Sequence, residues 1–390
     1  MRKLIIFIIL FVLFCASFYA FDLYIQIPKE AKQGLSVSEN LEIRTELNAA
    51  EKELSKASAH FYDEYLLRTK FNGAMLVAKN GRIVFEKYNG LTEINKGELI
   101  NANISFHLAS VSKTFTAMAI LKLWQNNQLL IDDLVSKYLP SFPYSEITLR
   151  DLLSHRSGLP NYVHFMEALN WDTHAVLTNQ SLYEFILKNY NKLRADRHNA
   201  YFDYCNTNYA LLALVIEKVS NLSYAEYLDK TFFKPLGMVH TFVYAPEMKD
   251  LVLPSFKFNN QREGFTFLDN IYGDKNIYST VRDMLKWDQA ITDGEMFTKA
   301  SLAEAFRGYS HEKKGIKNYG LGWRLYELPS GKKIIYHNGW WHGNNTVFSR
   351  VPDDSTTIIV LGNKFNRSIY QAKKIIGIYD GYGFQFNEEE

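Results

Sequence analysis

The sequence contains few cysteines, has almost no net charge, and has no internal repeats. Its two cysteines, Cys15 and Cys205, exclude a fold that is held together by disulfide bonds. The 44 lysine and arginine residues nearly balance the 42 aspartate and glutamate residues, and no basic tract stands out along the 390 positions. We therefore expect no nucleic acid as a partner.

What the chain does contain is typical of a folded globular protein. Hydrophobic residues make up 47% of the sequence and charged residues 22%, which excludes a mostly disordered chain. The aromatic content of 15% favours an extensive core and a cleft lined with rings. The length allows two or three domains, or one large composite domain.

Only the N-terminus carries a long apolar run. Arg2 and Lys3 precede an unbroken apolar stretch at 4–14, and small residues follow near position 20. This order is typical of an export signal, so residues 1–21 are expected to be a signal peptide. The protein is then expected in the periplasm or the cell envelope.

An uncleaved anchor is the alternative for this segment, because the apolar stretch reaches Phe21 and approaches membrane-spanning length. Membrane contact is then expected only through residues 1–21. A lipoprotein cysteine at Cys15 is disfavoured, since Phe14 stands where a small residue is required. Residues 22–46 are polar and indicate a linker.

Beyond the linker, the spacing of apolar residues changes twice. Residues 47–67 have helical spacing, and Asn80-Gly81 then separates two short apolar runs, which is a strong β-hairpin signal. Helical patterns prevail at 110–319, with helices expected at 110–125, 209–219 and 224–233. Strand patterns return after Gly320, at 322–328, 333–337, 346–351 and 356–361.

These patterns predict an α+β fold in one unit at 47–390. Its antiparallel sheet is expected to combine about 47–109 with 320–390, two segments far apart in the sequence. A helical part at about 110–319 is inserted between them.

A serine followed three residues later by lysine occurs at Ser110, Ser310 and Ser330. Only Ser110 begins a predicted buried helix, and there the spacing has a chemical reason. Residues i and i+3 lie on one helix face, with Cβ atoms about 5–6 Å apart. Lys113 can then accept the serine proton, and the helix N-terminus adds positive potential and a free backbone N–H. An N-terminal cap with an ordinary lysine is the alternative.

Two further elements carry polar groups suited to the same cleft. Tyr204 and Asn206 stand two apart on a predicted loop before a helix, so that a phenol and an amide can project together. A helix cap by Asn206 is the alternative there. His337-Asn338-Gly339-Trp340 ends a predicted strand, and Gly339 allows a close approach of the backbone. A core or surface histidine is the alternative for His337.

In this order, Ser110-x-x-Lys113, Tyr204-x-Asn206 and His337-x-Gly339 resemble the class C β-lactamase and low-molecular-weight penicillin-binding serine hydrolases. The resemblance covers about residues 55–365. Further segments that resemble the family are Thr148–Pro160, Phe233–Met238 and Tyr278–Thr280 with Trp287. The segment around His155 is interpreted as shaping the edge of the cleft.

The resemblance implies a sheet domain flanked by helices, a helical domain and a cleft between them. Ser110 is expected to attack an acyl carbon, while Lys113 and Tyr204 manage the proton. The backbone N–H groups of Ser110 and Trp340 are expected to form the oxyanion hole. Asn206, His337 and Gly339 are expected to orient the substrate, and neither a metal nor another cofactor is required.

The sequence departs from dedicated class C β-lactamases, which have lysine where this chain has His337. A histidine charge varies between about pH 5 and 8 when its environment is ordinary, so recognition of a substrate carboxylate is in doubt. We expect an exported serine hydrolase for small-molecule or cell-wall peptide, amide or ester substrates, similar to D-Ala-D-Ala carboxypeptidases, D-aminopeptidases or esterases. A non-catalytic penicillin-binding receptor and a true β-lactamase are the alternatives.

Overall fold

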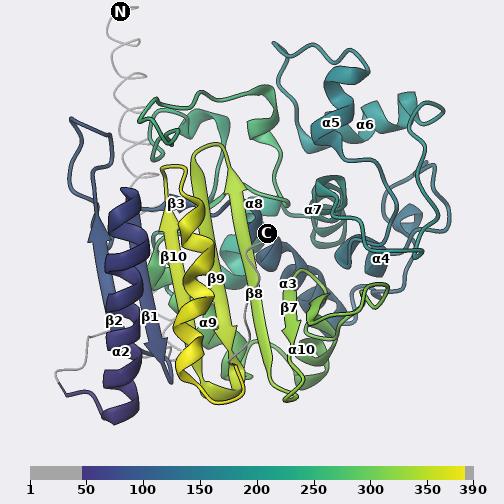
Figure 1. Cartoon of the computed structure of the whole chain (residues 1–390). Coiled ribbons are helices and arrows are strands. Elements are labelled where there is room, and N and C mark those ends of the chain that lie inside the picture. Colours follow the sequence, from purple (N-terminus) through teal and green to yellow (C-terminus); the bar gives the residue numbers. More distant parts are fainter. Residues whose placement is uncertain (1–45, 383–390) are drawn as a thin grey trace, which may run out of the picture. The chain divides into compact units, whose positions relative to one another are not determined.

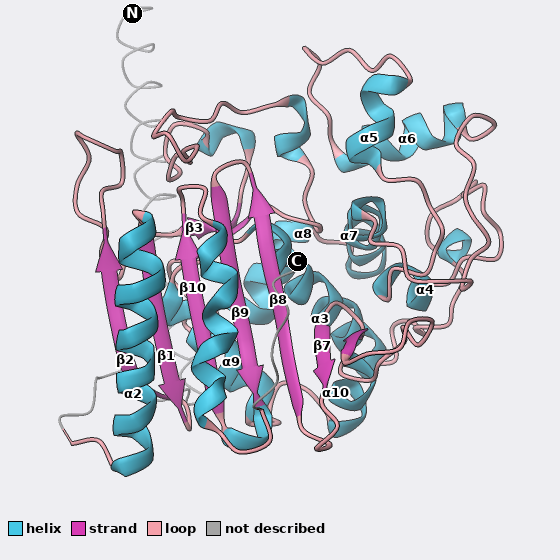
Figure 2. Cartoon of the chain, in the orientation of Figure 1, coloured by secondary structure: helices cyan, strands magenta, loops and turns pink. Residues whose placement is uncertain are grey.

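The computed structural model describes residues 46–382, which are built around a seven-stranded sheet (Figures 1 and 2). The strand order is β2-β1-β10-β9-β8-β7-β6, and all neighbouring strands are antiparallel. The bounds are β1 Gly73–Lys79, β2 Arg82–Asn89, β6 Lys317–Tyr319, β7 Arg324–Glu327, β8 Lys333–Trp341, β9 Asn344–Val351 and β10 Thr356–Gly362. Since β1 pairs with β10, one sheet joins segments far apart in the sequence, and the predicted α+β fold is confirmed.

The hairpin between β1 and β2 forms at Asn80-Gly81, as predicted. Both residues have positive φ, 50° and 71°, which a two-residue turn between twisted strands requires. Asparagine and glycine adopt this conformation at low cost, so the local sequence determines where the strand reverses.

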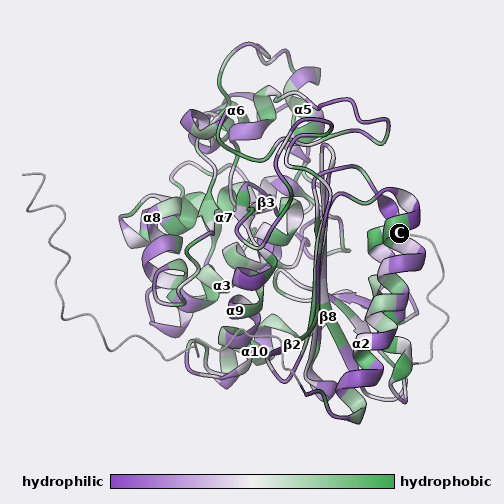
Figure 3. Ribbon diagram, turned by 90° about the vertical axis from the view of Figure 1, so that its left-hand side faces the viewer, coloured by the Kyte–Doolittle hydropathy of each residue, from purple (hydrophilic) through white to green (hydrophobic). Residues whose placement is uncertain are grey.

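Strand β1 is buried on both faces, which explains its unbroken apolar sequence. Ala74, Leu76 and Ala78 pack into one core, and the alternate residues Met75 and Val77 pack into another. Figure 3 shows the sheet edge-on between these two layers. Helix α2, Ala49–Phe61, covers one face together with the 3-10 helix Arg367–Ile378.

Helices α3, Ser112–Gln125, and α9, Val281–Thr292, lie on the other face of the sheet (Figure 3). Eleven residues of α3 are buried, so this helix is the centre of the larger core. The other α-helices of residues 46–382 are α4 Leu149–Leu153, α5 Tyr162–Ala168, α6 Asn179–Asn189, α7 Asn206–Ser220, α8 Tyr224–Leu228 and α10 Lys299–Ala305.

The structure differs from the sequence patterns in three places. A second sheet, β3-β5-β4, joins Phe106–His107, Ile277–Ser279 and Phe242–Val243. These strands have two or three residues, too few to show a period. Strand β8 extends to Trp341, beyond the predicted 333–337. The predicted helix 224–233 is α8 followed by a π-helical turn, Asp229–Phe233.

The predicted signal peptide, residues 1–21, lies outside the described residues, and so does the predicted linker up to residue 45. Within 46–382, no helix is both long enough and apolar enough to cross a membrane.

Candidate active site

Ser110 lies in a 3-10 turn, Ala109–Val111, that leads directly into α3. Lys113 is fully buried, and its Nζ donates to Ser110 Oγ at 3.1 Å. The same Nζ donates to Asn206 Oδ1 and to the backbone oxygen of Asp274, both at 2.8 Å. Three oxygen atoms thus lie within hydrogen-bond distance of this nitrogen. The structure therefore brings Ser110, Lys113 and Asn206 together.

The turn before Ser110 is held in an unusual conformation. Ala109 has a φ of 49°, in the left-handed region that costs a non-glycine residue about 1–2 kcal/mol. Its backbone N–H donates to His107 Nδ1 at 3.0 Å. The other ring nitrogen, Nε2, lies 2.9 Å from Asn276 Oδ1. His107 thus fixes the backbone at the residue before the predicted nucleophile.

Tyr204 stands at the end of the loop before α7, and its ring faces the same lysine. Lys113 Nζ lies 5.0 Å from the ring centroid of Tyr204. The ring of His155 lies behind Tyr204, with centroids 4.3 Å apart, and His155 Nδ1 accepts the backbone N–H of Cys205 at 3.1 Å. His155 therefore contacts Tyr204 directly, which the sequence pattern did not indicate.

His337 occupies a different environment from the one expected. It is fully buried, with Nε2 3.3 Å from Tyr319 Oη and Nδ1 2.7 Å from the backbone oxygen of Asn338. Burial, reinforced by the charges of Arg324 and Lys113, holds its pKa well below the ordinary value of 6.5. The ordinary environment in which a histidine changes its charge between pH 5 and 8 is therefore not present at His337, because the imidazole is buried.

Gly339 lies against the nucleophile turn. A Cβ at this position would be 2.2 Å from Thr346 Oγ1, 2.5 Å from the Leu108 oxygen and 3.0 Å from Ala109 Cβ. No side chain fits, so glycine is required for β8 to approach Ser110 this closely. The next residue, Trp340, has a side chain that is 64% exposed.

A cavity of about 1070 Å³ opens beside these groups. This volume is large enough for a substrate of peptide size. The predicted site residues that line it are Ser110, Tyr204, Asn206, Gly339 and Trp340, whereas the fully buried Lys113 and His337 are behind its lining. Other lining residues are Val163, His164, Lys257, Phe258, Glu263, Arg324, Asn338, Trp341, His342, Asn345, Phe365, Arg367 and Tyr370.

Two residues that contribute to the site, Asp274 and Arg324, were not among the residues predicted from the sequence. Asp274 contributes to the site through its backbone oxygen, which no side-chain motif can reveal. Arg324 lies with its guanidinium carbon 5.3 Å from the Tyr204 ring centroid and supplies a permanent positive charge. The available sequence signal for Arg324 was its position in a strand pattern, 13 residues before His337. This signal was too weak to identify it as a site residue.

Acid is expected to destabilise the protein, because three histidines around the site are buried. The pKa of His107 is lowered to about 4 by burial, and burial also lowers the pKa values of His155 and His337. A histidine of the unfolded chain takes up its proton near pH 6.5. Their contribution to stability is therefore complete above pH 6.5 and is lost as the pH falls toward the folded pKa values.

Below pH 6.5, each such histidine lowers the free energy of unfolding by up to about 1.4 kcal/mol for every pH unit that the pH falls. We expect the free energy of unfolding, measured in urea at pH 7, 6 and 5, to fall steeply below pH 6.5. His337→Gln should reduce the slope, and His174→Gln at an exposed position should not. A flat profile would contradict the burial of neutral imidazoles.

Comparison with known proteins gives results in agreement with this geometry. The family model described as Beta-lactamase matches residues 59–376. Penicillin-binding protein 4* of Bacillus subtilis (strain 168) is 34% identical over 324 residues, which cover 77% of this chain and 70% of the relative. The teichoic acid D-alanine hydrolase of Staphylococcus aureus (strain NCTC 8325 / PS 47) is 31% identical over 318 residues, covering 80% and 75%.

Solved structures also share the fold. The penicillin-binding protein from Bacillus halodurans superimposes with a TM-score of 0.71 at 20% identity, covering 82% of this chain and 98% of that structure. At this identity the likeness concerns the fold alone. It nevertheless places the seven-stranded sheet and the inserted helices within one known architecture.

Proposed function

The chain belongs to the β-lactamase family and is a serine hydrolase, and from this we propose that it forms an acyl-enzyme through Ser110 with peptide, amide or ester substrates. The observation that carries the proposal is the hydrogen bond from the buried Lys113 Nζ to Ser110 Oγ, at the wall of a large cavity. A buried amine beside a serine hydroxyl has the arrangement of an activated nucleophile.

In the proposed reaction, Lys113 acts as the neutral amine: Ser110 Oγ attacks the acyl carbon while its proton passes to the lone pair of Lys113 Nζ, and Tyr204 shares in the transfer. The backbone N–H groups of Ser110 and Trp340 stabilise the oxyanion. The bond to the leaving amine or alcohol then breaks, and the leaving group takes the proton. Water hydrolyses the resulting ester and restores Ser110. Proton transfer of this kind contributes about 10²–10⁴-fold, and one oxyanion donor about 2.7–4 kcal/mol.

The substrate class follows from the relatives and from the charges in the cavity. One relative is named as a D-alanine hydrolase, which supports a D-alanyl ester, amide or peptide as substrate here. Asn206 and Gly339 are proposed to orient the substrate within the cavity. His337 is proposed to act from behind the lining, as a neutral partner of Tyr319. Arg324 then supplies the positive charge for a substrate carboxylate that the neutral His337 does not.

The experiment compares turnover of a D-alanine p-nitrophenyl ester, D-alanine p-nitroanilide, a D-Ala-D-Ala peptide and nitrocefin by the full-length protein. We expect hydrolysis of the D-alanyl compounds to exceed that of nitrocefin, and Ser110→Ala to abolish all of it. Efficient turnover of nitrocefin alone would identify a β-lactamase. Stoichiometric acylation without turnover would identify a penicillin-binding receptor.

Export to the periplasm or the cell envelope is part of the proposal and rests on residues 1–21. We expect nearly all of the protein in the envelope fraction, with an N-terminus near residue 22 on sequencing. A membrane-bound pool that starts at Met1 would indicate an uncleaved anchor. A cytoplasmic pool that starts at Met1 would refute export.

A further inference from the structure

A buried ion pair lies behind Lys113, on the segment that leads into β5. Asp274 and Lys275 are each 2% exposed, and Lys275 Nζ lies 3.5 Å from Asp274 Oδ2. The fully buried Tyr162, at the start of α5, donates its hydroxyl to the same Oδ2 at 2.8 Å and accepts a hydrogen bond from Lys275 Nζ. Neither charged side chain lines the catalytic cavity, and the acyl-transfer steps proposed above use neither charge.

The backbone of Asp274 connects this pair to Lys113. Its carbonyl oxygen is one of the three oxygens around Lys113 Nζ, together with Ser110 Oγ and Asn206 Oδ1. An ammonium donates to all three. A neutral amine has two N–H groups for the two amide oxygens and directs its lone pair at the Ser110 hydroxyl, and only this state accepts the serine proton. Since the three contacts fit both states, the surrounding charges determine at which pH the reactive state appears.

The carboxylate of Asp274 is a negative charge on the residue that Lys113 contacts. A negative charge so near favours the ammonium, which cannot accept a proton. Its Oδ1 has no hydrogen-bond partner among residues 46–382, so the carboxylate is compensated by Tyr162 and Lys275. The positive charge of Lys275 therefore opposes the effect of Asp274 on Lys113.

Lys275 and Lys113 affect each other's protonation. Burial lowers the pKa of Lys275, the carboxylates of Asp274 and Asp269 raise it, and the charge of Lys113 lowers it. Coupling between two binding equilibria is reciprocal. The charge of Lys275 therefore disfavours the proton on Lys113 to the same extent.

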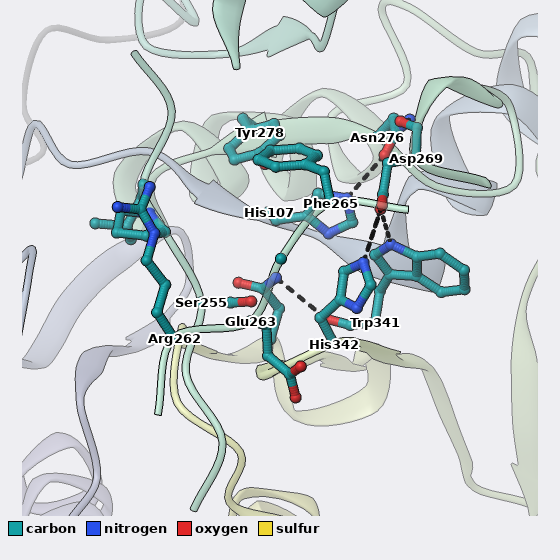
Figure 4. A pocket seen from close by; sticks show the side chains of 14 residues that line it. His107, Ser255, Arg262, Glu263, Phe265, Asp269, Asn276, Tyr278, Trp341 and His342 are labelled. Atoms are coloured by element: carbon teal, nitrogen blue, oxygen red, sulfur yellow. Dashed lines mark hydrogen bonds and ion pairs between the residues drawn. The ribbon is translucent and has the colours of Figure 1, made fainter. Parts of the chain in front are cut away.

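An aromatic ring and a second carboxylate hold the charged form of Lys275. Its Nζ lies 4.6 Å from the ring centroid of Trp341. The indole N–H of Trp341 donates to Asp269, whose Oδ1 also lies 2.9 Å from His342 Nε2 (Figure 4). Burial raises the pKa of Asp269, but the hydrogen bond and charge of His342 outweigh it and bring the pKa to about 2. Asp269 is therefore ionised, and with the Trp341 ring it favours a positive charge on Lys275.

The other titratable groups around Lys113 come from the helical part and from the large sheet. Burial holds the pKa values of His155 and His337 well below 6.5, and those of Tyr209 and Tyr319 well above 10, so all four are neutral. All other charges stay the same when only the ion pair is changed. They include Arg324 beside Tyr204, the exposed Asp203, and His164, Lys257, Glu263, His342 and Arg367 in the cavity lining.

We propose that Asp274 and Lys275 are positioning residues that act as a charge-balanced pair: the backbone of Asp274 orients Lys113, and Lys275 cancels the carboxylate that this backbone brings with it. Lys113 is then the neutral proton acceptor at the pH of the reaction. The inference rests on the proposed function, since it concerns the proton that Ser110 gives up. It requires the balance of the two charges, rather than either charge alone.

The test compares wild type, Lys275→Met and the double variant Asp274→Asn/Lys275→Met. The rate at which a fluorophosphonate forms the covalent adduct is followed by intact mass between about pH 6 and 10. We expect the midpoint of the rise in rate to move up by about one pH unit in Lys275→Met, because the unbalanced carboxylate favours the ammonium. In the double variant the midpoint should return close to the wild-type value, since both charges are gone and the Asp274 carbonyl remains.

Asp288→Asn is the matched control, because it breaks another buried ion pair, with Arg350, outside the lining of the catalytic cavity. It should lower the unfolding temperature and leave the midpoint unchanged. If Lys275 acts only through packing, both variants lose rate equally at every pH with an unmoved midpoint, which would overturn the proposal.

A midpoint that stays raised in the double variant would also overturn the proposal, since Asp274 would then not be its cause. The double variant leaves no unpaired buried charge, so it provides this test even if Lys275→Met does not fold. Failure of the proposed function is recognised separately, as absence of an adduct at Ser110 in the wild-type protein at any pH.

Discussion

Replacing Lys113 by alanine is expected to lower the rate of acylation by about 10²–10⁴-fold, the range for a positioned proton-transfer group. The side chain is fully buried, and its Nζ donates to Ser110 Oγ, Asn206 Oδ1 and the Asp274 oxygen. Water that enters the vacated space can restore the last two hydrogen bonds, but it is a much weaker base. The rate is measured as release of p-nitrophenol from an ester substrate.

Lys122→Ala is the matched control for this substitution. Lys122 lies on the same helix, and its Nζ donates to the backbone oxygen of Met296 at 2.7 Å, far along α3 from Ser110. It should leave the acylation rate within a factor of two or so of wild type, as for most substitutions away from a site. Similar losses in both variants, with matching falls in the unfolding temperature, would show that Lys113 acts only through stability.

Replacing Gly339 by alanine is expected to lower acylation by about 10²-fold, because a misplacement near 1 Å has an effect of this size. The added Cβ would overlap Thr346 Oγ1 and the Leu108 oxygen, so β8 must move away from the nucleophile turn. The backbone N–H of Trp340 would then move away from the acyl oxygen. The measurement is kcat/KM for an ester substrate, together with the unfolding temperature.

Gly377→Ala provides the control, since a Cβ there meets nothing within 4 Å. The control should retain wild-type activity and stability. If Gly339→Ala folds and retains full activity, the close approach of β8 to Ser110 has no catalytic role, and Trp340 is not an oxyanion donor.

The parts of the fold that sequence patterns predicted are those with local causes. The Asn80-Gly81 turn is set by two adjacent residues that accept positive φ. The spacing of Ser110 and Lys113 is set by one helical turn, and the hydrogen bond between them follows from it. The late strands after Gly320 were visible as apolar runs between turn clusters, because both faces of the central strands are buried.

The parts that could not be predicted depend on contacts between distant segments. The buried state of His337 results from packing against Tyr319, and a strand pattern does not show which face a partner covers. The strands of the small sheet have two or three residues and form only because β5 lies between β3 and β4. Asp269 and His342 are 73 residues apart, and each is unremarkable in its own segment.

The central claim is that Ser110 is the residue that becomes acylated. The most direct measurement is the intact mass of the full-length protein after reaction with a fluorophosphonate or a penicillin, followed by peptide mapping. We expect one adduct per molecule on Ser110 in the wild type and none in Ser110→Ala. An adduct that persists in Ser110→Ala, mapped to Ser310 or Ser330, would contradict the assignment.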